Sequence, residues 1–435
     1  ASDLKGEKAS NPTSSVTGRD DIGGVVGYTA GAVSQAVNYG AVDGGSRVGG
    51  IAGSGKAAIG ANNAANINYG PVNATGDYAG GIVGYHSENA AVSYNQNYGD
   101  IGADGSYVGG IAGAIRGTTA AANNINHGAI TAKGDYVGGV VGSASSADAQ
   151  SGESGAALTA AVNDGAVIGG DYVGGIAGLS RGSGALHTAE NHGAVTGGSY
   201  VGGIVGAAYG PLGNHTLATG VKNTATVTGT GDYIGGLGGY LKSASSTTRT
   251  VSYGYNTASV VGSDTSSYVG GIMGWGDGPV QYTYAAGEHN VITVTGDTNV
   301  GGLAGYVAES LTLASSYAYA DVNGGNALVG GVETDAEVTY ENTYTLAKKD
   351  GENAKTEAQF FSGEVAWLLG GGDGERNSAW GQEKGKLPTL IANKPVFKVS
   401  LAKAVAPEGA EVAVTDGSFG VPGETDAEGK FWRET

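Results

Sequence analysis

Tyr107-Val108-Gly109-Gly110-Ile111-Ala112-Gly113 is one of eleven close copies of a short glycine-rich phrase that recurs along this chain. The copies follow one another at intervals of 26 to 36 residues, and their Val-Gly-Gly parts begin at Ile22, Val48, Ala79, Val108, Val137, Val173, Val201, Ile234, Val269, Val300 and Val329. A period of about thirty residues is typical of a solenoid, in which each repeat covers the open face of its neighbour. The sequence therefore predicts one long repeat domain rather than several globular domains.

A second element precedes most copies of the phrase. It has the form Asn-x-Gly, which later gives way to Asn-Thr-Ala, and its asparagines are Asn38, Asn68, Asn97, Asn126, Asn163, Asn191, Asn223 and Asn256. Short runs of Val and Ile bounded by Gly, Asn and Asp indicate strands and turns, and no helical period is found before residue 355. We therefore predict an all-β fold, a parallel β-helix or solenoid of about eleven coils that we expect to be right-handed. A short C-terminal capping helix and a small β module should follow it.

Composition narrows the class of protein. Glycine is 85 of 435 residues, 40% of residues are apolar and 14% are charged, which suits neither collagen nor a disordered chain. The net charge of −18 argues against nucleic acid as a partner. No apolar run approaches the roughly 18 residues that span a membrane, so we expect no membrane insertion. The chain has no cysteine, which excludes disulfides and favours a bacterial exported protein whose leader, if any, precedes the first residue.

Stacked coils place equivalent residues in columns. We expect the Val before each glycine pair and the Ile after it to point inward, which requires a bend at the glycines. The asparagine column should form a ladder of side-chain amides. Tyrosines precede the phrase in seven consecutive coils, at Tyr78, Tyr107, Tyr136, Tyr172, Tyr200, Tyr233 and Tyr268. Two interpretations of the tyrosines stay open, a stacked ladder that stiffens the rod or an aromatic strip that binds a ligand.

The repeats end near Val332, and the rest of the chain differs in composition. We divide the chain into an N-terminal lead-in (1–20), the solenoid repeats (21–335), a C-terminal cap (336–392) and a small β module or the start of a following domain (393–435). Within the cap, Thr356-Glu357-Ala358-Gln359 has the spacing of a capping box and opens a predicted amphipathic helix over 356–369. This helix should cover the unpaired strand edges of the last coil.

No group of residues in the sequence predicts catalysis. Aspartates stand in the turn before the tyrosine column, at Asp77, Asp135, Asp171, Asp232 and Asp297. Polysaccharide-cleaving enzymes use paired carboxylates, but a position repeated from coil to coil favours local Asx turns over one unique site. Such a column could also hold structural calcium through oxygen atoms. Apart from that calcium, we expect no cofactor, no metal site and no catalytic residue.

The repeated Tyr-Val-Gly-Gly-Ile-Ala-Gly with its upstream Asn-x-Gly resembles the GLUG motif of bacterial surface proteins. The segment Phe361-Ser362-Gly363-Glu364-Val365-Ala366-Trp367-Leu368-Leu369, followed by Trp380-Gly381-Gln382, also resembles what often follows such repeats. The resemblance covers roughly residues 20–392 and implies an exported or wall-attached protein whose repeats form a stalk or an adhesive β-helix. Some relatives are IgA-cleaving metallopeptidases, but their His-Glu-x-x-His zinc signature does not occur here, so the resemblance implies no peptidase activity.

Three functions are compatible with these observations. The first is a non-catalytic, extracellular or cell-surface bacterial protein, a stalk or adhesin that projects or presents a binding face. The second is a carbohydrate-binding module that uses the stacked tyrosine strip to bind a host or cell-wall glycan or glycoprotein. The third is a polysaccharide lyase or hydrolase of the β-helix type. We expect a monomer, because a capped solenoid needs no partner to cover its ends.

Overall fold

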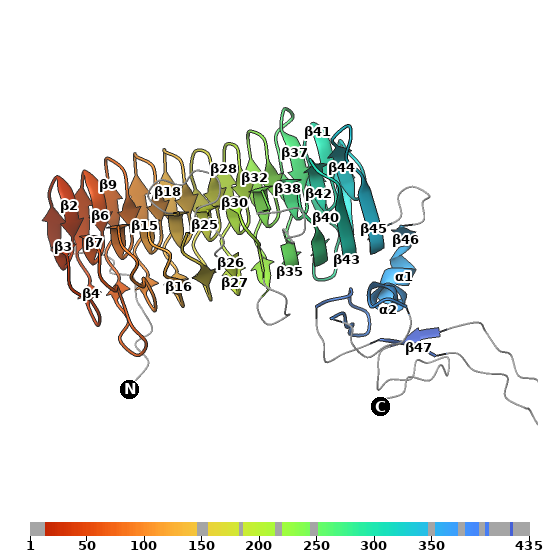
Figure 1. Ribbon diagram of the computed structural model, residues 1–435, viewed down its shortest axis with the longest axis horizontal. Helices are drawn as coiled ribbons and strands as arrows, with labels where there is room; N and C mark the ends of the chain where they lie inside the picture. The colour runs from red at the N-terminus through yellow and green to blue at the C-terminus, as the bar shows by residue number, and fades with distance from the viewer. Residues whose placement is uncertain are drawn as a thin grey trace, which may run out of the picture.

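The computed structural model describes residues 14–145, 155–181, 186–213, 220–243, 251–346, 353–372, 379–390, 396–399 and 418–420. Within these residues the chain forms a parallel β-solenoid of about eleven coils, which confirms the predicted fold. Figure 1 shows the coils stacked as one continuous rod that runs from the N-terminal to the C-terminal part of the chain. None of the helices in the described part is both long enough and apolar enough to cross a membrane.

Each coil bends at its glycine pair from one parallel sheet into another. The strands that enter the pair form a ten-stranded sheet: β2 (Asp20–Gly23), β6 (Ser46–Gly49), β10 (Ala79–Gly80), β14 (Val108–Gly109), β19 (Val137–Gly138), β24 (Val173–Gly174), β29 (Val201–Gly202), β33 (Ile234–Gly235), β37 (Ser267–Gly270) and β41 (Thr298–Gly301). The strands that leave it form an eleven-stranded sheet: β3 (Val26–Thr29), β7 (Ala52–Gly55), β11 (Val83–His86), β15 (Ala112–Ile115), β20 (Val141–Ala144), β25 (Ala177–Arg181), β30 (Val205–Tyr209), β34 (Gly238–Leu241), β38 (Met273–Gly276), β42 (Ala304–Val307) and β44 (Val329–Val332).

The rest of each coil lies in a 22-stranded parallel sheet with two rows of strands. The first row carries the asparagine column: β4 (Val37–Asn38), β8 (Ile67–Asn68), β12 (Gln96–Asn97), β17 (Ile125–Asn126), β22 (Val162–Asn163), β27 (Ala189–Asn191), β31 (Val221–Asn223), β35 (Val251–Asn256), β39 (Val280–Ala286), β43 (Leu311–Asn323), β45 (Val338–Leu346) and β46 (Ala354–Lys355). The second row, most of whose strands follow Asn-x-Gly or Asn-Thr-Ala, consists of β1 (Ser15–Thr17), β5 (Ala41–Gly44), β9 (Val72–Ala74), β13 (Ile101–Ala103), β18 (Ile130–Ala132), β23 (Val167–Ile168), β28 (Val195–Gly197), β32 (Val227–Gly229), β36 (Val260–Val261) and β40 (Ile292–Thr295). A small fourth sheet joins three neighbouring coils through β16 (Ala121–Ala122), β21 (Leu158–Thr159) and β26 (Leu186–His187).

The glycine pair is the corner between the first two sheets. Val108 before the pair and Ile111 after it are both fully buried, which confirms the predicted bend. A Cβ on Gly110 would lie 2.2 Å from the carbonyl oxygen of Gly139 in the next coil and 2.3 Å from Cγ of Asn126. Glycine is therefore required here, because the next coil and the asparagine column leave no room for a side chain.

One continuous hydrophobic core fills the rod from Val42 to Val329. It consists of Val, Ile, Leu, Ala and one Met, and it contains no aromatic residue. The coil is therefore narrow, and its aromatic side chains are placed elsewhere. His86 is a fully buried titratable side chain beside this core, with Nε2 3.0 Å from the carbonyl oxygen of Ala57. Burial lowers the pKa of His86 below its ordinary value, because the neutral form is favoured away from water.

The asparagine column forms the predicted ladder. Nδ2 of each asparagine donates to Oδ1 of the next at 2.8 Å, through eight residues from Asn38 to Asn256. The same Nδ2 also donates to a carbonyl oxygen two residues along, as Asn126 does to Gly128 at 2.8 Å. The ladder thereby satisfies buried amides that would otherwise destabilise the core. It ends where Ala285 takes the asparagine position in the next coil.

Two short helices follow the last coil, α1 (Glu357–Phe361) and α2 (Glu364–Leu369). The predicted capping box is present: Oγ1 of Thr356 accepts from the backbone N–H of Gln359 at 3.3 Å, and Oε1 of Gln359 accepts from that of Thr356 at 2.9 Å. The predicted single helix over 356–369 is wrong in one respect. Gly363 adopts a left-handed φ of 90°, which divides the segment into two helices.

The helices pack against the flank of the last coils, beside the end of β45 in Figure 1. Their shared hydrophobic cluster contains Tyr284, Ala286, Tyr317, Tyr319, Phe360, Val365, Leu369, Trp380, Leu387 and Leu390. The hydroxyl of Tyr317 donates to the carbonyl oxygen of Pro388 at 2.6 Å, which ties the segment to the rod. Farther along, β47 (Phe397–Val399) and β48 (Ser418–Gly420) pair antiparallel. The rest of the predicted module over 393–435 lies outside the described residues, as do residues 1–13 of the predicted lead-in.

Candidate functional site

The seven tyrosines of the predicted strip form one continuous stack along the outside of the rod, called the tyrosine stack below. Its members are Tyr78, Tyr107, Tyr136, Tyr172, Tyr200, Tyr233 and Tyr268. Neighbouring ring centroids are 4.4 to 4.9 Å apart, and the planes of neighbouring rings differ by 2° to 17°. All seven side chains are half-buried. The rings are therefore arranged as the stacking interpretation predicts.

The backbone explains the alignment of the rings. All seven tyrosines adopt a left-handed φ, between 57° and 68°. Such a conformation costs a non-glycine residue roughly 1–3 kcal/mol. It recurs because the parallel pairing that follows each tyrosine, such as that of Val108 with Val137, repeats the same corner in every coil. Ring stacking offsets part of this cost.

Stacking determines what the tyrosines offer a ligand. Both faces of each inner ring are covered by its neighbours, so a sugar ring has no free face to pack on, and the ring edges and hydroxyls are what face outward. Burial raises the pKa of Tyr107, Tyr136 and Tyr233 above the ordinary value, which keeps their hydroxyls protonated at neutral pH. The stack thus presents a row of hydroxyl donors and acceptors. Ligand binding by this row stays a prediction.

A column of the eleven-stranded sheet lies next to the tyrosine stack and is called the adjoining column. Its residues are Tyr28, Ser54, Tyr85, Ala114, Ser143, Leu179, Ala207, Tyr240, Trp275, Tyr306 and Gly331. Tyr85 meets the stack edge to face, with its ring centroid 5.1 Å from that of Tyr78. Tyr240 and Trp275, which occupy successive coils, stack at 4.3 Å, and burial raises the pKa of Tyr240 to about 12. The rings of Tyr240 and Trp275 therefore contact each other directly and leave no space between them for a ligand.

An open cavity of about 490 Å³ lies where the tyrosine stack begins. It is lined by Asp21, Tyr28, Arg47, Ser54, Tyr78, Tyr85 and Ser87. Asp21 and Arg47 occupy the stack position in the first two coils and form a two-point ion pair, with Nε 2.6 Å from Oδ1 and Nη2 2.9 Å from Oδ2. Oγ of Ser54 donates to Oδ1 of Asp21 at 2.6 Å. The hydrogen bond from the guanidinium holds the pKa of Asp21 below its ordinary value.

A second cavity of about 330 Å³ lies between the rod and the C-terminal segment. It is lined by Thr224, Tyr255, Thr257, Tyr284, Gly287, Glu288, His289, Tyr317, Glu383, Lys386, Leu387 and Thr389. Tyr255 and Tyr284 stack at 4.8 Å, and Nζ of Lys386 lies 2.7 Å from Oε2 of Glu383. Two of the aromatic rings and one pair of charged groups in this cavity are thus engaged with each other. It is a joint between two parts of the chain.

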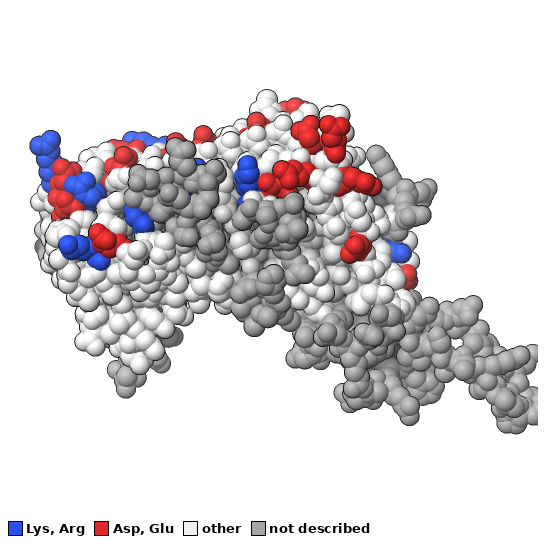
Figure 2. Space-filling model, viewed as in Figure 1, with Lys and Arg blue, Asp and Glu red and all other residues white. Residues whose placement is uncertain are grey.

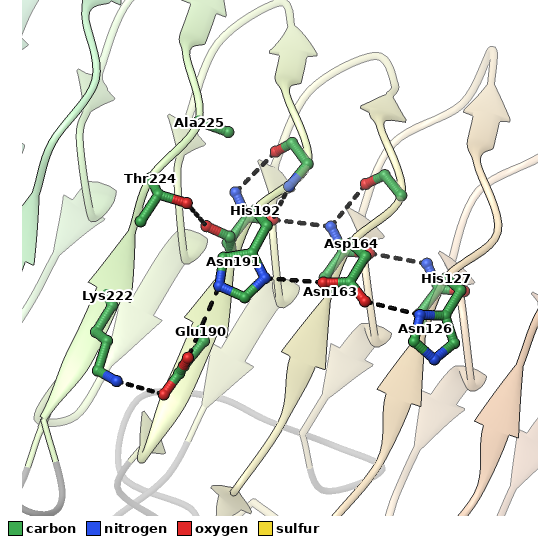
Figure 3. A network of polar contacts seen from close by, with 12 residues as sticks. Asn126, His127, Asn163, Asp164, Glu190, Asn191, His192, Lys222, Thr224 and Ala225 are labelled. Atoms are coloured by element: carbon green, nitrogen blue, oxygen red, sulfur yellow. Dashed lines mark hydrogen bonds and ion pairs between the residues drawn. The ribbon is translucent and has the colours of Figure 1, made fainter.

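A second surface column follows the asparagine ladder: Tyr39, Tyr69, Tyr98, His127, Asp164, His192, Thr224 and Thr257. The rings of its first four members stack at 4.5 to 5.0 Å. Figure 3 shows the part that follows, where Asp164 lies between two imidazoles, with Oδ2 2.7 Å from Nδ1 of His127 and Oδ1 2.8 Å from Nδ1 of His192. Glu190 and Lys222 extend this polar network at 2.5 Å. Half-exposed pairs of this kind contribute about 0–1 kcal/mol each.

The aspartates before the tyrosine stack bond to the next coil. Oδ1 of Asp77 accepts from the backbone N–H of Ser106, and Oδ1 of Asp135 accepts from that of Asp171, both at 2.8 Å. These bonds join coils, whereas the predicted Asx turns would close within one turn. In the part of the chain that the structure describes, no group of three or more His, Asp or Glu residues is placed to hold a metal ion.

Sequence reasoning missed a second amide ladder. Nδ2 of Asn66 donates to Oδ1 of Asn95 at 3.0 Å, and Nδ2 of Asn95 donates to Oδ1 of Asn124 at 3.1 Å. Each residue stands two positions before a member of the first ladder, so the repeated Asn-x-Asn spacing was the available signal. The cavity at the start of the tyrosine stack was missed as well, because its walls come from different coils.

In comparisons with known proteins, no family model, no curated protein and no solved structure matches this chain. Its function is therefore argued from the residues described above.

Proposed function

We propose that this chain is a non-catalytic bacterial protein of the cell surface or exterior, a rod-shaped stalk or adhesin that projects or presents a binding face to a glycan or glycoprotein. The likeness of its repeats to the GLUG motif of bacterial surface proteins belongs to the same proposal. One observation supports this proposal most directly: the polar and aromatic side chains that recur along the rod form hydrogen bonds and ring stacks with the next coil.

The asparagines illustrate this use. Asn126 donates to Asn163 and accepts from Asn97, both at 2.8 Å, and it is fully buried. A catalytic group must be singular, positioned and available to a substrate. A residue that is repeated in eight consecutive coils and bonded on both sides is neither singular nor available. The same holds for Asp135, whose Oδ1 accepts from the next coil.

The continuous bonding also suits a projecting rod. Each coil pairs with the next through three sheets, and the amide ladder and the tyrosine stack add bonds in the same direction. Stability in such an array is approximately a sum over neighbouring coils, so the array can be lengthened without a new fold. A stalk needs this property, whereas an enzyme needs one defined site.

The test is an assay for products. The purified chain is incubated with a panel of neutral and acidic polysaccharides, and the solution is assayed for new reducing ends and for the absorbance of unsaturated uronates. We expect neither signal above that of a boiled sample. Time-dependent release of either product, lost on boiling, would overturn the non-catalytic proposal in favour of a hydrolase or a lyase.

A further inference from the structure

We infer that the cavity at the start of the tyrosine stack is a binding site for one neutral pyranose ring, held between Tyr28 and Tyr85. The inference deepens the proposed function, because it names a site and a ligand class for an adhesive rod. It rests on that proposal only for the source of the sugar, a surface glycan. The geometry of the site stands on its own.

The walls of the site follow from the register of the eleven-stranded sheet. Tyr28 and Tyr85 pair with Ser54 from opposite sides, so the two tyrosines lie two coils apart in the adjoining column. Ser54 is too short to fill the space between them. Tyr28 is 56% exposed, a large apolar surface left open to solvent beside a cavity.

The spacing fits a ring of atoms. Strands are about 4.8 Å apart, so two steps of the column separate the tyrosines by about 9.6 Å. A sugar ring that contacts one side chain on each side needs about 7–8 Å, twice the optimal carbon–carbon separation, and Tyr85, whose ring stands at 71° to that of Tyr78, contributes a ring edge to this contact. The slot between Tyr28 and Tyr85 therefore admits one ring and no second layer.

The floor of the slot is polar and nearly neutral. Asp21 and Arg47 neutralise each other through their two-point ion pair, and Ser54 adds a hydroxyl. A carboxylate and a guanidinium side by side can accept from one sugar hydroxyl and donate to its neighbour. Asp20 also lies close enough to influence Arg47. Figure 2 shows side chains of both signs close together at the N-terminal end of the rod. With Asp20 the group carries one negative charge in excess, which disfavours a phosphate, and the paired Asp21 and Arg47 suit the hydroxyls of a neutral ligand.

The remainder of the adjoining column shows why the slot occurs here. Tyr240 and Trp275 occupy successive coils and stack at 4.3 Å, which leaves no space between them. The four members in the middle coils, from Ala114 to Ala207, include no aromatic residue that could form walls. Among the non-aromatic residues of this column, all of them described, Ser54 alone has an aromatic neighbour on each side.

Saturation-transfer NMR on the whole chain tests the site. The probes are the methyl pyranosides of glucose, galactose, mannose and N-acetylglucosamine, with adenosine monophosphate as an anionic aromatic comparison. We expect saturable transfer to at least one pyranoside, strongest at the protons of its apolar face. We expect the adenosine monophosphate signal to be at least tenfold weaker.

Three variants locate the binding. S54Y should weaken the saturation-transfer signal of the pyranoside at least tenfold, because a ring at this position would fill the slot. Tyr28→Ala should weaken it by the same factor, because it removes one wall of the slot. Tyr39→Ala is the matched control, since Tyr39 is 58% exposed and stacks on Tyr69 in a different column. The control should bind as the wild type does. Circular dichroism and a denaturation midpoint establish that each variant is folded.

The outcomes separate the site from the proposed function. Absence of transfer to every pyranoside, or transfer that persists unchanged in folded S54Y, would overturn the site and leave the stalk proposal untouched. Stronger binding of adenosine monophosphate than of any pyranoside would also overturn it, in favour of a planar anionic ligand. Pyranoside binding that is lost in S54Y would support the site. This support would hold even if the product assay detected catalysis and so overturned the non-catalytic proposal.

Discussion

At the scale of the residue, the dominant constraint is the distance to the next coil. Gly110 has a backbone oxygen and an asparagine side chain where its Cβ would be. Tyr136 adopts a left-handed φ of 59° because the corner that repeats in every coil requires it, and its ring stacks on both sides. His86 is fully buried, with its Nε2 beside the carbonyl oxygen of Ala57. Each of these residues is fixed by neighbours that lie about one repeat away in the sequence.

Gly110→Ala should lower the free energy of unfolding by about 3 kcal/mol, the upper range for overpacking, because the new methyl group would overlap Gly139 and Asn126. Gly31→Ala is the matched control, since a Cβ there meets nothing within 4 Å. Its effect should stay within about 0.5 kcal/mol. Urea midpoints measure both changes. Equal midpoints for the two variants would contradict the packing argument.

His86 should make the rod sensitive to acid. Its pKa is lowered in the folded state, so the unfolded chain binds the proton more tightly and stability falls as pH drops below about 6.5. The loss approaches about 1.4 kcal/mol per pH unit until the folded pKa is reached. In His86→Met this dependence should be smaller, with the remainder that His187 contributes through its own lowered pKa, and it is measured as the difference in unfolding free energy between pH 7.5 and pH 5.5. Parallel pH curves for wild type and variant would count against a buried neutral imidazole.

At the scale of the element, the repeated columns are the structural unit. Their existence could be predicted from the sequence, because the asparagines and the glycine pairs recur at nearly constant spacing and each has a recognisable physical role. The contacts that the side chains of each column make were harder to predict than the existence of the columns. The carboxylate of Asp77 reaches Ser106 in the next coil, and the slot beside Ser54 has walls from two different coils. Such contacts depend on the register between coils, which the sequence does not state.

Asn126→Ala should destabilise the rod by about 3 kcal/mol, because it leaves buried amide groups of Asn97 and Asn163 each one partner short. Asn73→Ala is the control: Asn73 is exposed, and its Nδ2 donates to Oδ1 of Asp43 at 2.8 Å. The control should change the unfolding free energy by less than about 0.5 kcal/mol. Denaturation of both variants under one condition measures the difference. A smaller effect for Asn126→Ala than for Asn73→Ala would be evidence against the ladder as a stabilising element.

At the scale of the whole molecule, the rod should tolerate the loss of complete coils. Deleting residues 79–136 joins Tyr78 to Val137 and removes two full repeats, so every column stays in register. The shortened chain should fold, with a longest dimension reduced by about 9.6 Å. Small-angle scattering and circular dichroism measure this outcome. Deletion of residues 79–122 breaks the register and should prevent folding, and equal behaviour of the two deletions would contradict the solenoid account.

The sequence predicted the architecture of the whole molecule better than its ends. Repetition made the solenoid evident, whereas residues that occur once gave weaker signals. Gly363 divides the predicted terminal helix, and Tyr317 joins the following segment to the flank of the rod through Pro388. The helix break at Gly363 and the hydrogen bond between Tyr317 and Pro388 each occur once, so no repeated pattern in the sequence could have predicted them.

The most direct test of the proposed surface location uses the absence of cysteine in this chain. Thr131 is exposed in the middle of the rod and Ala144 is buried, so Thr131→Cys and Ala144→Cys form a matched pair. Both are expressed in the organism that carries the gene, and intact cells are treated with a maleimide that cannot cross membranes. Our account predicts that Thr131→Cys is labelled on intact cells and that Ala144→Cys is labelled only after denaturation. Labelling of Thr131→Cys only after cell lysis would contradict a surface-exposed rod.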